Sequence, residues 1–159
     1  MGVTTTGVDV GDTAPDFDLP TNGGGRVSSA ALKGKSYAIY FYPKADTSGC
    51  TVQAQGVQAA LAQFVKAGVT VIGVSPDPVK RLDAFAKKFG LTFPLAADEA
   101  QTLAGAYGTW VEKSMYGKKY MGMERSTFLV GADGKVKAVW RKVKPADHAD
   151  LLLAAVKDL

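Results

Sequence analysis

Cysteine is nearly absent from this sequence, since Cys50 is the only one among 159 residues. A single cysteine excludes an internal disulfide framework, a C-x-x-C redox pair and a metal cage made of thiolates. Histidine is equally scarce, with His148 alone. Because no acidic cluster compensates, we predict neither a metal site nor a cofactor. The lack of disulfides favours the reducing cytoplasm.

Long apolar runs are also missing. No stretch approaches the ~18 apolar residues that a membrane helix needs. The first residues have no basic start followed by an apolar segment, so we predict no secretory signal and no membrane contact. Apolar residues make up 47% of the chain and charged residues 21%, which is typical of a globular protein. We expect one domain over residues 1–159, with residues 1–10 as a flexible lead-in.

The excess of positive charge is small. The 19 lysines and arginines exceed the acidic residues by four, and they are scattered along the chain. Only Trp140 to Lys144, "WRKVK", is densely cationic. A protein that binds nucleic-acid phosphates would need a tighter basic stripe with stacking aromatics. We therefore predict no nucleic-acid partner.

Hydrophobic periodicity predicts alternating strands and helices. The "DG" pair at Asp133 indicates a hairpin between the last two strands, and Thr21 to Gly25 reads as a hairpin or loop tip. This order predicts an α/β protein, a thioredoxin-like three-layer sandwich with a mixed central sheet. The expected strands are 37–42, 69–75, about 92–96, 125–131 and 135–143; the expected helices run from near 50 to 67, and over 79–89, 99–106 and 145–159.

Cys50 lies where the strand 37–42 has ended and the next helix begins. Ligands bind at the carboxyl ends of such strands, and the free N–H groups of a helix start stabilise a thiolate. Pro43 ends the strand and stiffens the loop. The Thr47 hydroxyl is placed to reach the sulfur or to cap the helix, and Gly49 allows close backbone approach. The pattern indicates a reactive thiol.

Two other interpretations of Cys50 remain open from the residues alone. A lone cysteine is commonly a small buried apolar residue, but "TSGC" is small and polar, and we expect it to be exposed. A cysteine hydrolase would need a histidine partner. The only candidate, His148, opens the last helix, where we expect it to be solvated.

The segment "YFYPKADTSGCTVQA", Tyr40 to Ala54, resembles the active-site signature of peroxiredoxins, P-x-x-x-T-x-x-C. Pro43, Thr47 and Cys50 stand at the required spacing. The flanking residues resemble one subfamily, bacterioferritin-comigratory protein or peroxiredoxin Q. The resemblance implies a thioredoxin-like fold and reduction of hydrogen peroxide and organic hydroperoxides. Further matching segments follow in order along nearly the whole chain: "GDTAPDFDLP", "VTVIGVSPD", "FGLTFPLAAD", "MYGKKYMGMERSTFLV" and "WRKVKPADHAD".

The resemblance also implies roles for individual residues. Cys50 is the peroxidatic cysteine, and Thr47 orients the sulfur and the bound peroxide. Arg125 matches the active-site arginine, whose guanidinium stabilises the thiolate and the charge growing on the departing oxygen. The N–H groups of Gly49 and Cys50 hold the peroxide, and Pro43 shields the sulfur from water.

The chain departs from the subfamily where a second, resolving cysteine is usual. The two usual positions correspond to Gln55 and Ala86, and Ser48 replaces the usual proline before the Gly-Cys pair. A sulfenic acid at Cys50 would then be resolved from outside. The expected reductant is a small thiol, the glutaredoxin or thioredoxin system, or Cys50 of another copy. We therefore predict a one-cysteine peroxidase mechanism.

In a second functional hypothesis, the protein keeps the fold but has lost catalytic turnover. It would then act as a catalytically impaired redox sensor or holdase chaperone. Retention of Pro43, Thr47, Cys50 and Arg125 together favours the enzyme. The resemblance suggests a monomer or weak dimer. The aromatic and Met-rich stretches "YGTW", "SMYG" and "YMGM" could line the substrate mouth or a dimer face, but we expect ordinary packing plus a loop.

Overall fold

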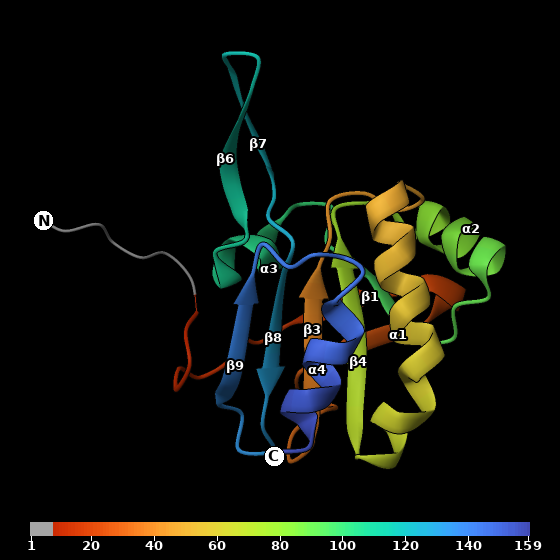
Figure 1. The fold of residues 1–159 in the computed structure, drawn as a ribbon, viewed down its shortest axis with the longest axis vertical. Helices are drawn as coiled ribbons and strands as arrows, with labels where there is room; N and C mark the ends of the chain where they lie inside the picture. The colour runs from red at the N-terminus through yellow and green to blue at the C-terminus, as the bar shows by residue number, and fades with distance from the viewer. Residues whose placement is uncertain (1–7) are drawn as a thin grey trace, which may run out of the picture.

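A computed structural model describes residues 8–159 of the chain, which form a mixed sheet with helices on it (Figure 1). The strands lie in the order β5-β4-β3-β8-β9. β3, β4 and β5 run parallel, while β8 is antiparallel to both β3 and β9. The predicted mixed α/β architecture is thus confirmed. The bounds are β3 Ser36–Phe41, β4 Val69–Ser75, β5 Leu95–Ala97, β8 Ser126–Val130 and β9 Val136–Arg141.

The central strand β3 is buried on both faces. Ala38 and Tyr40 point into one apolar cluster, and Ile39 and Phe41 into the other. Strands covered on both sides read as continuous apolar runs, which is why "YAIYFY" was recognisable in the sequence. The strand therefore fixes the position of whatever follows its carboxyl end.

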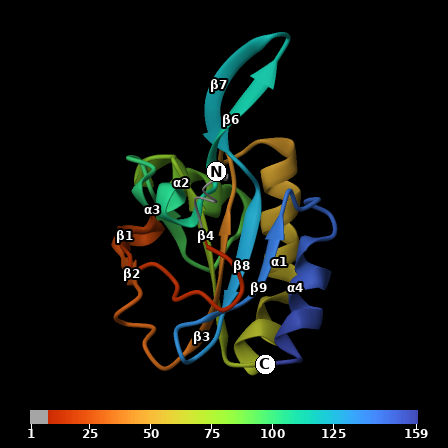
Figure 2. The same cartoon turned by 90° about the vertical axis from the view of Figure 1, so that its left-hand side faces the viewer.

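Two helices cover one face of the sheet. α1 (Ser48–Lys66) and α4 (His148–Val156) lie side by side there, as both views show (Figure 2). α2 (Val79–Phe89) adds Leu82 and Phe85 to the same cluster. On the opposite face, α3 (Thr102–Tyr107) contributes Leu103 and Tyr107 to the second cluster. These layers match the predicted sandwich.

The segment Thr21–Gly25 forms the expected hairpin tip. β1 (Asp18–Pro20) and β2 (Arg26–Ser28) pair antiparallel around the short 3-10 turn η1 (Asn22–Gly24). Gly23 and Gly24 have φ of 76° and 75°, which glycine adopts without the clash that a Cβ causes.

A second hairpin, β6 (Trp110–Met115) with β7 (Lys118–Met123), projects past the end of the main sheet (Figures 1 and 2). Our expectation of ordinary packing plus a loop is wrong here. Only the base packs: Met123 is buried in the second cluster, and Trp110 packs against it. The turn is Tyr116-Gly117, with φ of 52° and 78°. Because Asn-Gly is the usual sequence for such turns, the sequence signal for this hairpin was weak. Four large apolar side chains of the β6–β7 hairpin are exposed: Met115, Tyr116, Tyr120 and Met121.

The lead-in expected at residues 1–10 falls mostly outside the described residues. Within them, Val8 is buried, and its carbonyl accepts a hydrogen bond from Arg141 Nη2 at 3.2 Å. Gly11 donates its N–H to the Val136 carbonyl at 2.9 Å. Among residues 8–159, no helix is long and apolar enough to span a membrane.

Candidate active site

Cys50 is the third residue of α1, just beyond the carboxyl end of β3. The β6–β7 hairpin projects from this same end of the molecule (Figure 1). Cys50 is only 2% exposed, so the expectation of an exposed thiol is wrong. Cys50, Ala54 and Val57 form one buried stripe of α1, which turns the sulfur inward although the preceding loop residues are solvated. That stripe was readable at i, i+4 and i+7.

The first turn of α1 offers free backbone donors. Among residues 8–159, no acceptor meets the N–H groups of Ser48, Gly49 and Cys50, and the first helical bond runs from Thr51 N to Thr47 O at 2.9 Å. Thr47 is the N-cap residue, but its side chain makes no capping bond. Three N–H groups thus surround the start of the helix, where they favour negative charge.

Thr47 itself lies on the surface. Its hydroxyl donates to the Lys44 carbonyl at 2.8 Å, and it bonds neither the sulfur nor the helix N–H groups as we expected. The bond to Lys44 uses the hydroxyl proton and leaves the oxygen lone pairs able to accept. Pro43 lies half-buried in the same loop, one residue after Tyr42.

Arg125 directly precedes β8, as its place in the sequence predicted. Phe41 pairs with Ser126 across the sheet, so Arg125 comes to the end of β3. Its Nη2 donates to Cys50 Sγ at 3.4 Å, and its Nη1 donates to Gln53 Oε1 at 2.5 Å. The guanidinium is thus in hydrogen-bond contact with the sulfur and with the α1 residue one turn further on. The two predicted residues, 75 positions apart, are brought together by strand pairing.

Gln53 was not predicted. It is fully buried one turn after Cys50 on α1, and its Nε2 has no partner among the described residues. Residues three apart share one face of a helix, so the spacing from Cys50 was a signal that could have been used. Gln53 holds one nitrogen of Arg125 while the other faces the sulfur.

The absence of a side chain at Gly49 leaves space for the guanidinium of Arg125. A Cβ at this position would lie 3.2 Å from Arg125 Nη2 and 3.4 Å from Pro145 Cγ. The close neighbours of Gly49 are thus the guanidinium of Arg125 and the ring of Pro145. A larger residue would push the cation away from the sulfur.

The loop before α1 is held by two acidic residues that sequence reasoning missed. Buried Asp77 accepts the Ala45 N–H at 2.7 Å and the Ser75 hydroxyl at 2.9 Å through one oxygen. Asp46, at φ 63°, pairs with Lys88 of α2 at 3.0 Å. Nothing in the sequence pattern pointed to these partners, because they come from β4 and α2.

His148 is buried, with 1% of its surface exposed, so our expectation of a solvated histidine is wrong. The first residue of α4 faces the sheet, where His148 Nε2 lies 2.8 Å from Thr127 Oγ1 and the ring packs on Tyr40. Burial, together with the charge of Arg125, lowers the pKa of His148 to about 4. It is therefore neutral near pH 7. Within the described part of the chain, no hydrogen bond joins it to Cys50, which argues against a Cys–His hydrolase.

Two phenols complete the surroundings of the sulfur. Burial, with the nearby Cys50 among the smaller causes, raises the pKa of Tyr40 and of Tyr42 well above the usual value. Neither hydroxyl has a partner within residues 8–159. Both phenols therefore stay protonated near pH 7.

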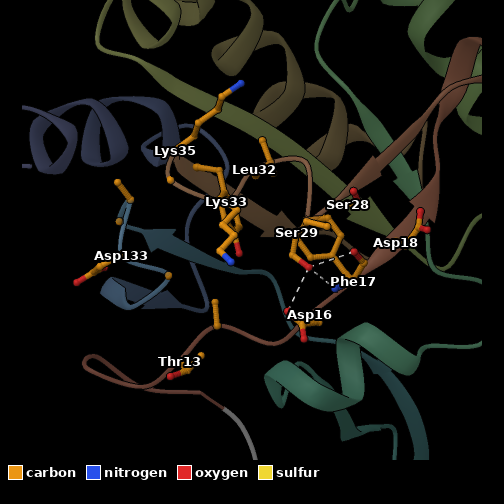
Figure 3. A pocket seen from close by; sticks show the side chains of 17 residues that line it. Thr13, Asp16, Phe17, Asp18, Ser28, Ser29, Leu32, Lys33, Lys35 and Asp133 are labelled. Atoms are coloured by element: carbon orange, nitrogen blue, oxygen red, sulfur yellow. Dashed lines mark hydrogen bonds between the residues drawn. The ribbon is translucent and has the colours of Figure 1, made fainter.

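A hollow of about 880 Å³ lies at the other end of β3 (Figure 3). Phe17, Ser29 and Lys33 line it, and neither Cys50 nor Arg125 does. Ser29 Oγ there accepts the Phe17 N–H at 3.0 Å. A second hollow of about 430 Å³ includes Arg125 in its lining, so it shares this one residue with the thiol site.

Neither position expected for a resolving cysteine carries a thiol. Gln55 is exposed on α1, and Ala86 is buried on α2. Cys50 is thus a buried thiol with a guanidinium and three free N–H groups beside it, and no second cysteine exists in the sequence.

Comparison with known proteins gives a consistent result. The profile of the AhpC/TSA family matches residues 10–139. The putative peroxiredoxin Bcp of Coxiella burnetii is 47% identical over 141 residues, covering 89% of this chain and 93% of the relative. Peroxiredoxin Bcp of Xanthomonas campestris is 47% identical over 146 residues, covering 91% of each.

Solved structures agree on the fold. Bacterioferritin comigratory protein of X. campestris, studied for alkyl peroxide reduction, superposes with a TM-score of 0.87 at 43% identity, covering 95% of this chain and 96% of the other. Structures of peroxiredoxin Q from the same organism include serine mutants of two different cysteines. That relative thus carries a cysteine more than this chain.

Proposed function

Because the chain belongs to the AhpC/TSA family, and within it to the Bcp or peroxiredoxin Q group of peroxiredoxins as a one-cysteine variant, we propose that it is a thiol-dependent peroxidase. Its substrates are hydrogen peroxide and organic hydroperoxides. The observation that carries this proposal is the 3.4 Å contact of Arg125 Nη2 with the sulfur of Cys50 at the uncapped start of α1.

In the first step, the Cys50 thiolate attacks one oxygen of the peroxide. An S–O bond forms, the O–O bond breaks, and the electron pair of that bond leaves on the distal oxygen, which takes up a proton. Cysteine is oxidised to sulfenic acid, and the peroxide is reduced to water or an alcohol. Arg125 stabilises charge on the departing oxygen because it is already oriented by Gln53.

The residues around Cys50 have positioning roles in this proposal. The N–H groups of Gly49 and Cys50 donate to the peroxide, since they have no other acceptor within the described chain. The Thr47 oxygen accepts a hydrogen bond from the peroxide, because its own O–H is donated to the Lys44 carbonyl. Pro43 limits the access of water from the loop side.

An external thiol resolves the sulfenic acid in the second step. Its sulfur attacks Cys50 Sγ, a mixed disulfide forms, and water leaves. A second thiol then attacks the mixed disulfide, releasing Cys50 and a small disulfide. A small thiol, or the glutaredoxin or thioredoxin system, would supply both equivalents, since the sequence holds no second cysteine.

A sensor or holdase is the second candidate, and the missing resolving cysteine favours it. The two are separated by trapping Cys50 after one equivalent of hydrogen peroxide. Dimedone, which labels sulfenic acids, is added and the mass is measured, with and without a preceding pulse of dithiothreitol. A peroxidase is labelled at Cys50 when dimedone is added directly, and it is not labelled when the dithiothreitol pulse comes first, because the pulse has already reduced the sulfenic acid. Label that persists after the pulse identifies a thiol that is oxidised without turnover, and no label at all refutes the peroxidase.

The domain extent, the compartment and the oligomeric state of the protein are also proposals. We propose that residues 1–159 form one peroxiredoxin domain that acts in the cytoplasm as a monomer or weak dimer. The single thiol supports a reducing compartment. Light scattering after size exclusion at two concentrations measures the mass, and a tetramer or larger assembly would contradict this statement.

A further inference from the structure

The 430 Å³ hollow beside Arg125 lies between the β6–β7 hairpin and the end of β9. It shares Arg125 with the thiol site, and Arg125 Nη2 touches the sulfur. A molecule seated in it therefore contacts the same residue whose guanidinium contacts Cys50. The lining residues are Val111, Glu112, Lys113, Ser114, Tyr120, Glu124, Arg125 and Lys142.

The charges of the hollow favour an anion. Both of its carboxylates face cations that are not part of the lining: Glu112 pairs with Lys119 at 3.6 Å, and Glu124 with Arg141 at 3.7 Å. Within residues 8–159, the cations of the lining have no carboxylate partner. Lys113 Nζ donates to the Met123 carbonyl at 2.5 Å, and Arg125 bonds Gln53 and Cys50.

Lys142 is the lining cation whose ammonium group is free to bind an anion. Among residues 8–159, no hydrogen bond or ion pair engages its ammonium group within the structure. Its position is fixed nonetheless, because the next residue, Val143, donates its N–H to the Arg125 carbonyl at 3.1 Å. Lys142 therefore stands at the rim of the hollow, beside Arg125.

The hollow also has an apolar side. Val111 and Tyr120 line it, and Tyr120 is 44% exposed. Its volume lies within the range of about 300 to 1,000 Å³ that small-molecule sites occupy. The combination suits a small organic molecule with an apolar stem and a carboxylate.

We propose that this hollow binds the carboxylate of a small molecule that reacts at Cys50. The inference rests on the proposed peroxidase function and names the substrate class that the site prefers. Such a carboxylate can belong to the thiol that resolves the sulfenic acid or to the hydroperoxide that forms it. Both place a reactive sulfur or oxygen over Arg125 while the acid group sits against Lys142 and Lys113.

The thiol arm of the test compares glutathione with its diethyl ester. Cys50 is oxidised with one equivalent of hydrogen peroxide, and the return of the free thiol is followed by stopped flow at low salt. The hydroperoxide arm compares linoleic acid hydroperoxide with its methyl ester, using dithiothreitol as reductant. Each arm is run on the protein as it is, on Lys142→Glu, and on Lys144→Glu as the matched control outside the hollow.

The expected result is a preference for the acid over the ester in at least one arm. Lys142→Glu reduces that preference about tenfold, whereas Lys144→Glu changes it less than twofold, because charge reversal acts strongly only at contact distance. The arm that shows the preference identifies the ligand. Equal rates for acid and ester in both arms, or equal losses in both variants, would overturn the proposal.

Failure of this inference and failure of the proposed function look different. If the protein clears hydrogen peroxide with dithiothreitol but ignores the carboxylate, the peroxidase stands and the carboxylate site is refuted. If hydrogen peroxide is not consumed at all, the peroxidase proposal fails. Circular dichroism of both lysine variants confirms that they fold, and Lys142→Gln repeats the test without reversing the charge.

Discussion

Arg125 holds two contacts at once, one to Cys50 Sγ and one to Gln53 Oε1. That geometry depends on the fork of a guanidinium, which the single ammonium group of lysine does not reproduce. We expect Arg125→Lys to lower kcat/KM for hydrogen peroxide by about 100-fold, the size of effect that follows loss of an oriented donor at a transition state.

The matched control is Arg26→Lys, which changes an exposed arginine paired with Asp18. Its kcat/KM should stay within a factor of two. Activity of Arg125→Lys near that of the unmodified protein would mean that the cation matters and the fork does not.

His148 makes stability depend on pH. Its pKa is about 4 in the folded protein, lowered by burial, against ~6.5 for an exposed histidine. Between these values the unfolded chain binds a proton that the folded chain does not. The free energy of unfolding should therefore fall as pH drops from ~6.5 towards 4, by up to about 3 kcal/mol in total, and His148 contributes no slope above pH 7.

Urea unfolding of the protein and of His148→Gln from pH 7.5 to 4 measures this contribution. Since the chain has one histidine, the difference between the two curves isolates it from the carboxylates. The variant should lose its disadvantage as pH falls. Parallel curves would show that His148 titrates normally in the folded state.

At the scale of elements, α1 decides whether an internal disulfide is possible. Gln55 is exposed five residues after Cys50 in the same helix. In a regular helix their Cα atoms lie about 9 Å apart, beyond the ~7 Å that a disulfide allows. A resolving thiol at this position can react only if the first turns of α1 unwind.

We therefore expect Gln55→Cys to restore a two-cysteine mechanism at the cost of helix. After one equivalent of peroxide, titration with Ellman's reagent should count no free thiol, and far-ultraviolet circular dichroism should show less helix than in the reduced form. Gln58→Cys, further along α1, serves as control and should keep a free thiol. Retention of a free thiol in Gln55→Cys would show that α1 does not open.

The elements that the sequence predicted well are those with strong periodicity and clear ends. The strand 37–42 and the helix closed by Gly90, at φ 63°, are examples. The β6–β7 hairpin was missed because its strands face solvent and carry no buried alternation. Burial of His148 was missed because it begins a helix whose inward face only the packed sheet reveals, whereas burial of Cys50 was readable from its spacing to Ala54 and Val57.

At the scale of the whole molecule, the site depends on strand pairing. β3 delivers Cys50, and its antiparallel neighbour β8 delivers Arg125 from 75 residues away. Sequence resemblance could name both residues, and helical spacing pointed to Gln53, but Asp77 and the hollow at Lys142 come from the tertiary arrangement. No local pattern encodes which side chains meet across β4, α1 and the hairpin.

The central claim is that Cys50 turns over with a thiol supplied from outside. The most direct measurement follows hydrogen peroxide consumption over many turnovers, with dithiothreitol as the only reductant, by the protein and by Cys50→Ser. The account predicts that the protein clears a large excess of peroxide and that the variant consumes no more than a blank. Consumption that stops at about one equivalent, or equal activity in the variant, would contradict it.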